Sequence, residues 1–194
     1  MAPTTKVSAT TDDCLHQVTH GVQVTSVLTA KDRALAQTVL MRSLRLQAGQ
    51  PLDLAAIEEI LPQLISNRVR QIEHRVLRCQ LDGVAREKVE RDLTSRGLRP
   101  ATAGDLFSVF CRGTISGLAG TQVHALGQEL VIGEWKYYLT VIFPLKPGST
   151  GLERNPGHPK PILGLTEVTE LGVKSWGKTD RFLAVVALPK SRAR

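Results

Sequence analysis

The chain has 194 residues, of which 42% are hydrophobic and 22% are charged. This composition excludes collagen-like, fibrous and wholly disordered proteins, and the length suffices for a domain with its own hydrophobic core. Lysine and arginine number 25 against 18 aspartate and glutamate residues, which gives a formal net charge of +7. The excess favours contact with phosphate groups or acidic partners, but no basic tail concentrates it.

The cysteines and the first residues bear on the compartment. Cys14, Cys79 and Cys111 are odd in number and widely spaced, which argues against a disulfide framework and for a reducing environment. The first residues lack the apolar segment of a signal peptide, and no stretch approaches the roughly 18 apolar residues of a membrane span. We therefore expect a cytoplasmic protein without membrane contact.

Residues 1–12 are rich in threonine, serine and alanine without apolar periodicity, which predicts a disordered tail. Residues 13–194 are expected to form a single domain. Within residues 15–28, the alternation of Val22 and Val24 with polar neighbours indicates a short strand.

Capping residues mark the start of two helices early in the chain. Thr29 and Asp32 have the spacing of a capping box, and apolar residues follow at helical spacing until Gly49. Asp53 can cap a second helix, which Pro62 either kinks or divides.

Two more helices are expected further along. Residues 84–93 form an amphipathic stretch closed by Gly97. A second capping box, Thr102 with Asp105, precedes a short apolar segment that predicts a helix in the core.

Residues 65–79 have the most regular apolar spacing in the chain, with alternate gaps of four and three positions. This spacing predicts a helix with a narrow apolar seam, which could pair with a second copy or another protein. The residues of the seam are Ile65, Val69, Ile72, Val76 and Cys79.

An arginine stripe, Arg68, Arg75 and Arg78, would run along the flank of this helix. Guanidinium groups spaced in this way can contact successive phosphates, so the stripe predicts a nucleic-acid contact. A solvated helix flank is the alternative.

Beyond Gly113, glycine and β-branched residues become frequent, which predicts strands. Apolar stretches place these strands at residues 121–126, 129–132, 134–143, 162–169 and 181–188. Between them, residues 144–161 are rich in proline and glycine and predict a long loop. We expect an α+β fold in which a helical layer, about residues 29–110, packs on a mainly antiparallel sheet, about residues 113–190.

The segment from Gly172 to Thr179 matches the phosphate-binding motif GxxxxGK[ST], with Gly177, Lys178 and Thr179 at its end. In such a loop, backbone amides surround the phosphates and the lysine reaches the terminal oxygens. A P-loop joins an early parallel strand to a helix, whereas here a strand is predicted after Thr179. The context favours a hairpin turn over a nucleotide site, and we expect no cofactor.

Glu134 and Lys136 on a predicted strand, with Asp105 upstream, resemble the acidic pair and lysine of PD-(D/E)xK nucleases. Two carboxylates could hold Mg²⁺ while the lysine stabilises charge on the phosphate. A solvent-facing charge pair on a strand is favoured instead, because Asp105 lies at a helix cap. A metal-dependent phosphodiesterase is the alternative function.

Cys14, His16 and His20 could supply two or three zinc ligands. No second ligand pair completes a tetrahedral set, so a polar loop is favoured and no metal is expected.

Short motifs resemble a family of small uncharacterised bacterial proteins. The matching segments are RGLRPAT at residues 96–102, DLF at 105–107, HALG at 124–127, and Trp176 with RFLAV at 181–185. The resemblance covers about residues 93–188. The family has no established activity, so the resemblance implies no site. It implies that Thr102 begins a helix, that Gly127 breaks a strand, and that residues 182–185 form a core strand.

The sequence therefore predicts a basic, non-enzymatic module that binds nucleic acid or another protein. Protein binding would include a homodimer formed along the seam.

Overall fold

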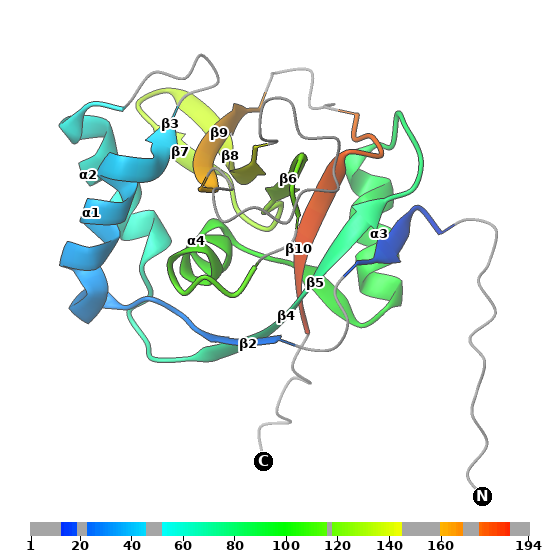
Figure 1. Ribbon diagram of the computed structural model, residues 1–194, viewed down its shortest axis with the longest axis horizontal. Coiled ribbons are helices and arrows are strands. Elements are labelled where there is room, and N and C mark those ends of the chain that lie inside the picture. Colours follow the sequence, from blue (N-terminus) through cyan, green and yellow to red (C-terminus); the bar gives the residue numbers. More distant parts are fainter. Residues whose placement is uncertain are drawn as a thin grey trace, which may run out of the picture.

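The computed structural model describes residues 13–18, 23–45, 52–115, 118–144, 160–168 and 175–186. Within these ranges, four α-helices and a ten-stranded sheet form an α+β fold, which confirms the predicted class (Figure 1). The predicted tail and most of the loop at 144–161 lie outside the described residues. The prediction that the first helix runs to Gly49 is wrong, because the helix ends at Ser43 and the next two residues, Leu44 and Arg45, form a strand that pairs with Leu163 and Gly164. No helix among the described residues combines the length and the apolar character needed to cross a bilayer.

The first two helices begin at the predicted caps. The capping box of Thr29 and Asp32 forms on a 3-10 turn, Ala30–Asp32, and α1 continues over Arg33–Ser43. The side chain of Asp53 accepts a hydrogen bond from the Ala56 amide and begins α2, Leu54–Leu64. Pro62 lies in the last turn of α2 and does not divide it.

The next two helices are also confirmed. Helix α3 covers Arg86–Ser95 and ends before Gly97, whose φ of 68° lies in the left-handed region that favours glycine. Helix α4 covers Ala103–Cys111, and Thr102 caps it as predicted.

The strands form one sheet in the order β1-β4-β10-β6-β8-β9-β3. Three short strands lie outside this order, and each pairs with a longer strand beyond the end of a neighbour. Strand β2 follows β1 along the edge of β4, β5 follows β6 along the edge of β10, and β7 follows β6 along the edge of β8. All pairs are antiparallel except β6 with β10 and β3 with β9. The strands are β1 Leu15–Gln17, β2 Gln23–Ser26, β3 Leu44–Arg45, β4 Gln71–Cys79, β5 Leu98–Pro100, β6 Thr121–His124, β7 Leu130–Ile132, β8 Trp135–Phe143, β9 Ile162–Glu167 and β10 Asp180–Val186.

The helix predicted over residues 65–79 is wrong, because most of that segment forms β4 inside the sheet. Ile72 and Val76 point into one hydrophobic cluster, whereas Leu77 and Cys79 point into another on the opposite face. Since both faces are buried, apolar residues do not simply alternate along the strand, and their spacing imitates a helix. The coiled-coil-like seam does not exist, and Val69 precedes the strand with 86% of its surface exposed.

Two hydrophobic clusters cover the two faces of the sheet. Helices α1, α2 and α4 pack over one face and α3 over the other (Figure 1). The larger cluster includes Leu40, Ile60, Leu64, Leu106, Phe107, Leu139 and Leu183. The smaller cluster includes Leu15, Leu77, Val89, Leu93, Trp176 and Phe182.

Gly127 holds the segment before α4 close to the segment after β6. Its amide donates a hydrogen bond of 2.9 Å to the carbonyl oxygen of Ala101. A Cβ atom added at Gly127 would lie 2.6 Å from the carbonyl oxygen of Pro100 and 2.9 Å from that of Ala101. Both contacts are with backbone, so a side chain here requires the two segments to separate.

We predict that Gly127→Ala lowers the free energy of unfolding by about 1–3 kcal/mol, measured by urea denaturation. Gly164→Ala is the matched control, because its added Cβ would lie 2.9 Å from Cδ1 of Ile142, a side-chain end that can rotate away. Equal losses in the two variants would contradict the assigned close approach at Gly127.

Candidate functional site

Asp105 lies in the first turn of α4 and forms a reciprocal capping box with Thr102. Its amide donates to Oγ1 of Thr102 at 3.2 Å, and its Oδ2 accepts from the amide of Thr102 at 3.0 Å. The capping box turns the carboxylate back towards the strand that precedes the helix. The side chain of Asp105 is fully buried, so its charge requires partners.

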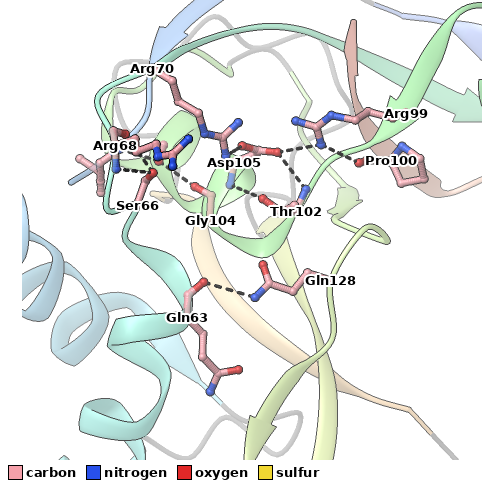
Figure 2. Close-up of polar contacts among 12 residues, drawn as sticks. Gln63, Ser66, Arg68, Arg70, Arg99, Pro100, Thr102, Gly104, Asp105 and Gln128 are labelled. Atoms are coloured by element: carbon pink, nitrogen blue, oxygen red, sulfur yellow. Dashed lines mark hydrogen bonds and ion pairs between the residues drawn. The ribbon is translucent and has the colours of Figure 1, made fainter. Parts of the chain in front are cut away.

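Two arginines supply these partners. Nη2 of Arg70 lies 2.7 Å from Oδ1 of Asp105, and Nη1 of Arg99 lies 3.2 Å from Oδ2. Figure 2 shows the two guanidinium groups on either side of the carboxylate. Each arginine side chain remains 39% exposed. The buried anion therefore fixes two cations that still face solvent, and the three charges sum to one positive charge.

Each guanidinium group retains hydrogen-bond donors. Arg70 uses only Nη2 in contacts with described residues, and Arg99 uses only Nη1, which also donates to the carbonyl oxygen of Pro100 at 3.2 Å. A guanidinium group carries five N–H bonds. Several donors on each arginine thus stay available to an anion.

The two arginines line a groove of about 470 Å³ where β2, β4, β5 and β10 meet. Its walls combine aliphatic side chains with charged and amide groups. The lining residues are Val24, Arg70, Gln71, Ile72, Glu73, Arg99, Val185 and Val186. A groove of this composition suits a small ligand with an anionic head and a flat or apolar body.

His74 and Arg99 belong to one line of cross-strand neighbours in the sheet. The register places Gln23, His74, Val185 and Arg99 side by side on β2, β4, β10 and β5. His74 is fully buried, and neither of its ring nitrogens has a well-aligned hydrogen-bond partner among the described residues. Burial lowers the pKa of His74, and a backbone contact with Ile72 and the nearby charge of Asp105 offset only part of this effect. The ring is therefore neutral at pH 7.

The predicted arginine stripe is not assembled. Arg68 lies in the turn before β4, where its amide and carbonyl bond the hydroxyl group of Ser66, on the Arg70 side of the site (Figure 2). Arg75 and Arg78 lie on β4, where a separation of three residues puts them on opposite faces of the sheet. Arg75 contacts Gln17 at 3.4 Å, and Arg78 pairs across the strands with other residues. Of these three arginines, only Arg68 lies near Arg70 (Figure 2).

The three residues of the predicted nuclease site are not brought together. The oxygens of Asp105 are occupied by Arg70, Arg99 and Thr102, because the capping box holds the carboxylate at the helix N-terminus. Lys136 instead lies 3.4 Å from Glu129, and Glu134 is in the turn between β7 and β8.

The P-loop-like residues lie in a turn. The amide of Asp180 donates to the carbonyl oxygen of Gly177 at 2.9 Å, so Lys178 and Thr179 are the central residues of a β-turn that leads into β10. Lys178 contacts Asp82 through its amide at 2.9 Å and through Nζ at 3.5 Å. A strand follows in place of the helix that a P-loop requires, and Gly172 lies outside the described residues.

This turn is fixed to the sheet by a buried polar chain. Oδ2 of Asp180 accepts from the amide of Gly177, and Oδ1 lies 2.9 Å from Nε2 of His124. In a neutral ring Nε2 then carries the proton, so Nδ1 accepts from the hydroxyl group of Thr140 at 2.9 Å. Thr166 continues the chain at 3.1 Å from Thr140. His124 is fully buried, so these contacts secure the fold.

The predicted metal residues occupy different surroundings. Cys14 is fully buried, and burial together with the charge of Asp92 raises the pKa of its thiol to about 12. His16 is exposed on β1 opposite Arg78, and His20 lies outside the described residues. In the described part of the chain, no group of three or more potential ligands lies close enough to hold a metal ion.

Arg70 and Arg99 were missed by the sequence analysis. Arg70 is two residues from Arg68 but falls off a stripe drawn with helical periodicity. Arg99 lies in the RGLRPAT segment, six residues before Asp105, and nothing in the sequence joins it to Arg70. An acidic residue in the first turn of an apolar helix, close to arginines in the chain, was the available signal.

No known protein family, curated protein or solved structure matches this chain. The resemblance to a family of small bacterial proteins therefore stays a prediction.

We predict that Asp105→Ala lowers the free energy of unfolding by about 3 kcal/mol, because two arginines and a helix cap lose their shared anion. Asp32→Ala is the matched control. Asp32 occupies the same capping-box position after Thr29, but it is partly exposed and contacts Arg112 at only 3.5 Å. The control should lose about 1 kcal/mol, measured by urea denaturation. Equal losses would contradict the assigned role of the arginine contacts.

Acid should destabilise the protein through His74. The unfolded ring has a pKa near 6.5, whereas the folded ring has a lower pKa, so below about pH 6.5 the unfolded state binds a proton that the folded state does not. The stability gained from the neutral ring is present above pH 6.5 and is lost as the pH falls towards the folded-state pKa.

In His74→Leu this contribution is absent, so urea unfolding between pH 7.5 and 5 should show a smaller pH dependence than in the parent protein. His16→Ala is the matched control, because it removes an exposed histidine. Parallel curves for His74→Leu and the parent would refute the assignment of a neutral buried ring.

Proposed function

We propose that this protein is a non-enzymatic nucleic-acid-binding module that contacts phosphate groups through Arg70 and Arg99, with Arg68 beside them. The observation that carries the proposal is the pair of half-exposed guanidinium groups fixed on either side of the buried Asp105 carboxylate. Guanidinium groups match phosphate oxygens with paired N–H donors, which makes arginine a preferred phosphate ligand.

Fixing the arginines in advance favours binding. A free arginine side chain loses rotamer entropy when it binds an anion. Here Asp105 already restrains Arg70 and Arg99 in the unbound protein, so less entropy remains to be lost. The formal charge of +7 adds long-range attraction for a polyanion.

The competing functions have less support. Self-association along the seam loses its basis, because residues 71–79 form a strand whose apolar side chains are buried within the fold. A metal-dependent phosphodiesterase needs carboxylates free to bind a cation, whereas Asp105 is engaged by two arginines.

We predict that the chain binds a fluorescein-labelled single-stranded 12-nucleotide DNA or RNA at low salt, measured by fluorescence anisotropy. Affinity should fall linearly on a plot of log K against log salt concentration. Arg68→Ala and Arg99→Gln should each weaken binding and reduce the slope by about 0.7, the value expected for one lost phosphate contact to a single strand.

Arg91→Ala is the matched control, because Arg91 is exposed on α3, the helix on the other face of the sheet. It removes the same charge and should leave the slope unchanged. Absence of binding at low salt would refute the proposal, and so would equal effects of all three variants.

A further inference from the structure

We infer that the groove beside Arg70 and Arg99 holds one nucleotide with a terminal phosphate. The phosphate would contact the N–H groups of the two guanidinium groups that Asp105 does not engage, and the base would lie along the groove. The inference rests on the proposed function and names the part of the nucleic acid that the site recognises.

The donors of the site suit a single terminal phosphate. Glu73 lines the same groove, so the charges of Arg70 and Arg99 are balanced by those of Asp105 and Glu73, but both arginines keep N–H groups unused by described residues. A terminal phosphate monoester offers three acceptor oxygens and a charge of about −1.5 to −2, whereas an internal phosphodiester offers two such oxygens and a single charge. The donor-rich pair therefore gains more from a terminal phosphate than from an internal one.

The dimensions of the groove limit what accompanies the phosphate. Its volume of about 470 Å³ falls within the range of about 300–1,000 Å³ that small-molecule sites occupy. A duplex is too wide for such a space, but one nucleotide fits it. No aromatic side chain is among the described residues that line the groove, so successive bases have no stacking platform there. These features favour one base packed against aliphatic walls.

The aliphatic walls provide surfaces for that base. Val24, Ile72, Val185 and Val186 line the groove, and Val24 is 53% exposed, so part of its surface is available to a ligand. Burying such surface against a base contributes roughly 25 cal/mol for each Å² of apolar area removed from water.

Glu73 adds a preference among bases. Its exposed carboxylate lines the same groove and can only accept hydrogen bonds. It repels a phosphate but can accept from an exocyclic amino group, as carboxylates do with N4 of cytosine. The site should therefore favour terminal cytosine, adenine or guanine over uracil or thymine.

The test compares single-stranded oligonucleotides of one sequence that carry a 5′-phosphate, a 3′-phosphate or no terminal phosphate, by anisotropy at fixed ionic strength. One phosphorylated end should bind at least about tenfold more tightly than the unphosphorylated strand. Nucleoside monophosphates used as competitors distinguish a strand end from a free nucleotide that carries the same chemistry.

Val24→Glu should abolish the preference for a phosphorylated end, because it places a negative charge in the groove. Val131→Glu is the matched control. It makes the same change at a strand residue of similar exposure, 44% against 53%, that does not line the groove. Glu73→Gln should bring the affinities for terminal cytosine and uracil to within about twofold of each other.

The outcomes separate the two levels of the proposal. If the strands bind equally well with and without a terminal phosphate, or if Val24→Glu keeps the preference, the groove assignment is overturned and nucleic-acid binding stands. If no strand binds but a nucleoside monophosphate does, the groove assignment stands and its ligand is the free nucleotide. If neither binds, both proposals fall.

Discussion

The buried carboxylate of Asp105 holds together the part of the molecule on which the candidate site depends. It accepts from the backbone at the start of α4, from Arg70 just before β4 and from Arg99 on β5. Removing a carboxylate from water costs free energy that only paired charges and hydrogen bonds offset. Because both arginines remain 39% exposed, the same contacts that stabilise the carboxylate hold two cations at the surface. At this residue the structural role coincides with the proposed functional one.

Two polar networks occupy opposite faces of the sheet and differ in how far a ligand can reach them. The network around His124 and Asp180 is inside the smaller cluster and fixes the turn before β10. The network around Asp105 opens onto a groove. Sequence motifs drew attention to the first region, since its turn matches a phosphate-binding loop. The geometry instead gives the second region the exposed cations and the space that an anionic ligand needs.

The sequence predicted the elements whose signals are local. Thr29, Asp53 and Thr102 mark helix starts through their own side chains, and the strands of the back half follow from β-branched and aromatic residues. It failed at β4, where pairing with β1, β2 and β10 decides the structure and both faces are buried. The error carried over to the site. Helical periodicity grouped Arg68 with Arg75 and Arg78, whereas strand geometry separates them. The association of Arg70 with Arg99 depends on long-range pairing, which no local pattern records.

The central claim is that Arg70 and Arg99, held by Asp105, contact the ligand's phosphate. The most direct measurement is an NMR titration that follows the Nε–H signals of individually assigned arginines while a single-stranded oligonucleotide is added. Arg86 on α3 serves as the internal reference, because its guanidinium group already pairs with Glu90 on the same helix and with Glu129 just before β7. We expect saturable shifts of Arg70 and Arg99 with Arg86 unchanged. Shifts of Arg86 as large as those of Arg70 and Arg99, or no shift of either arginine at saturation, would contradict it.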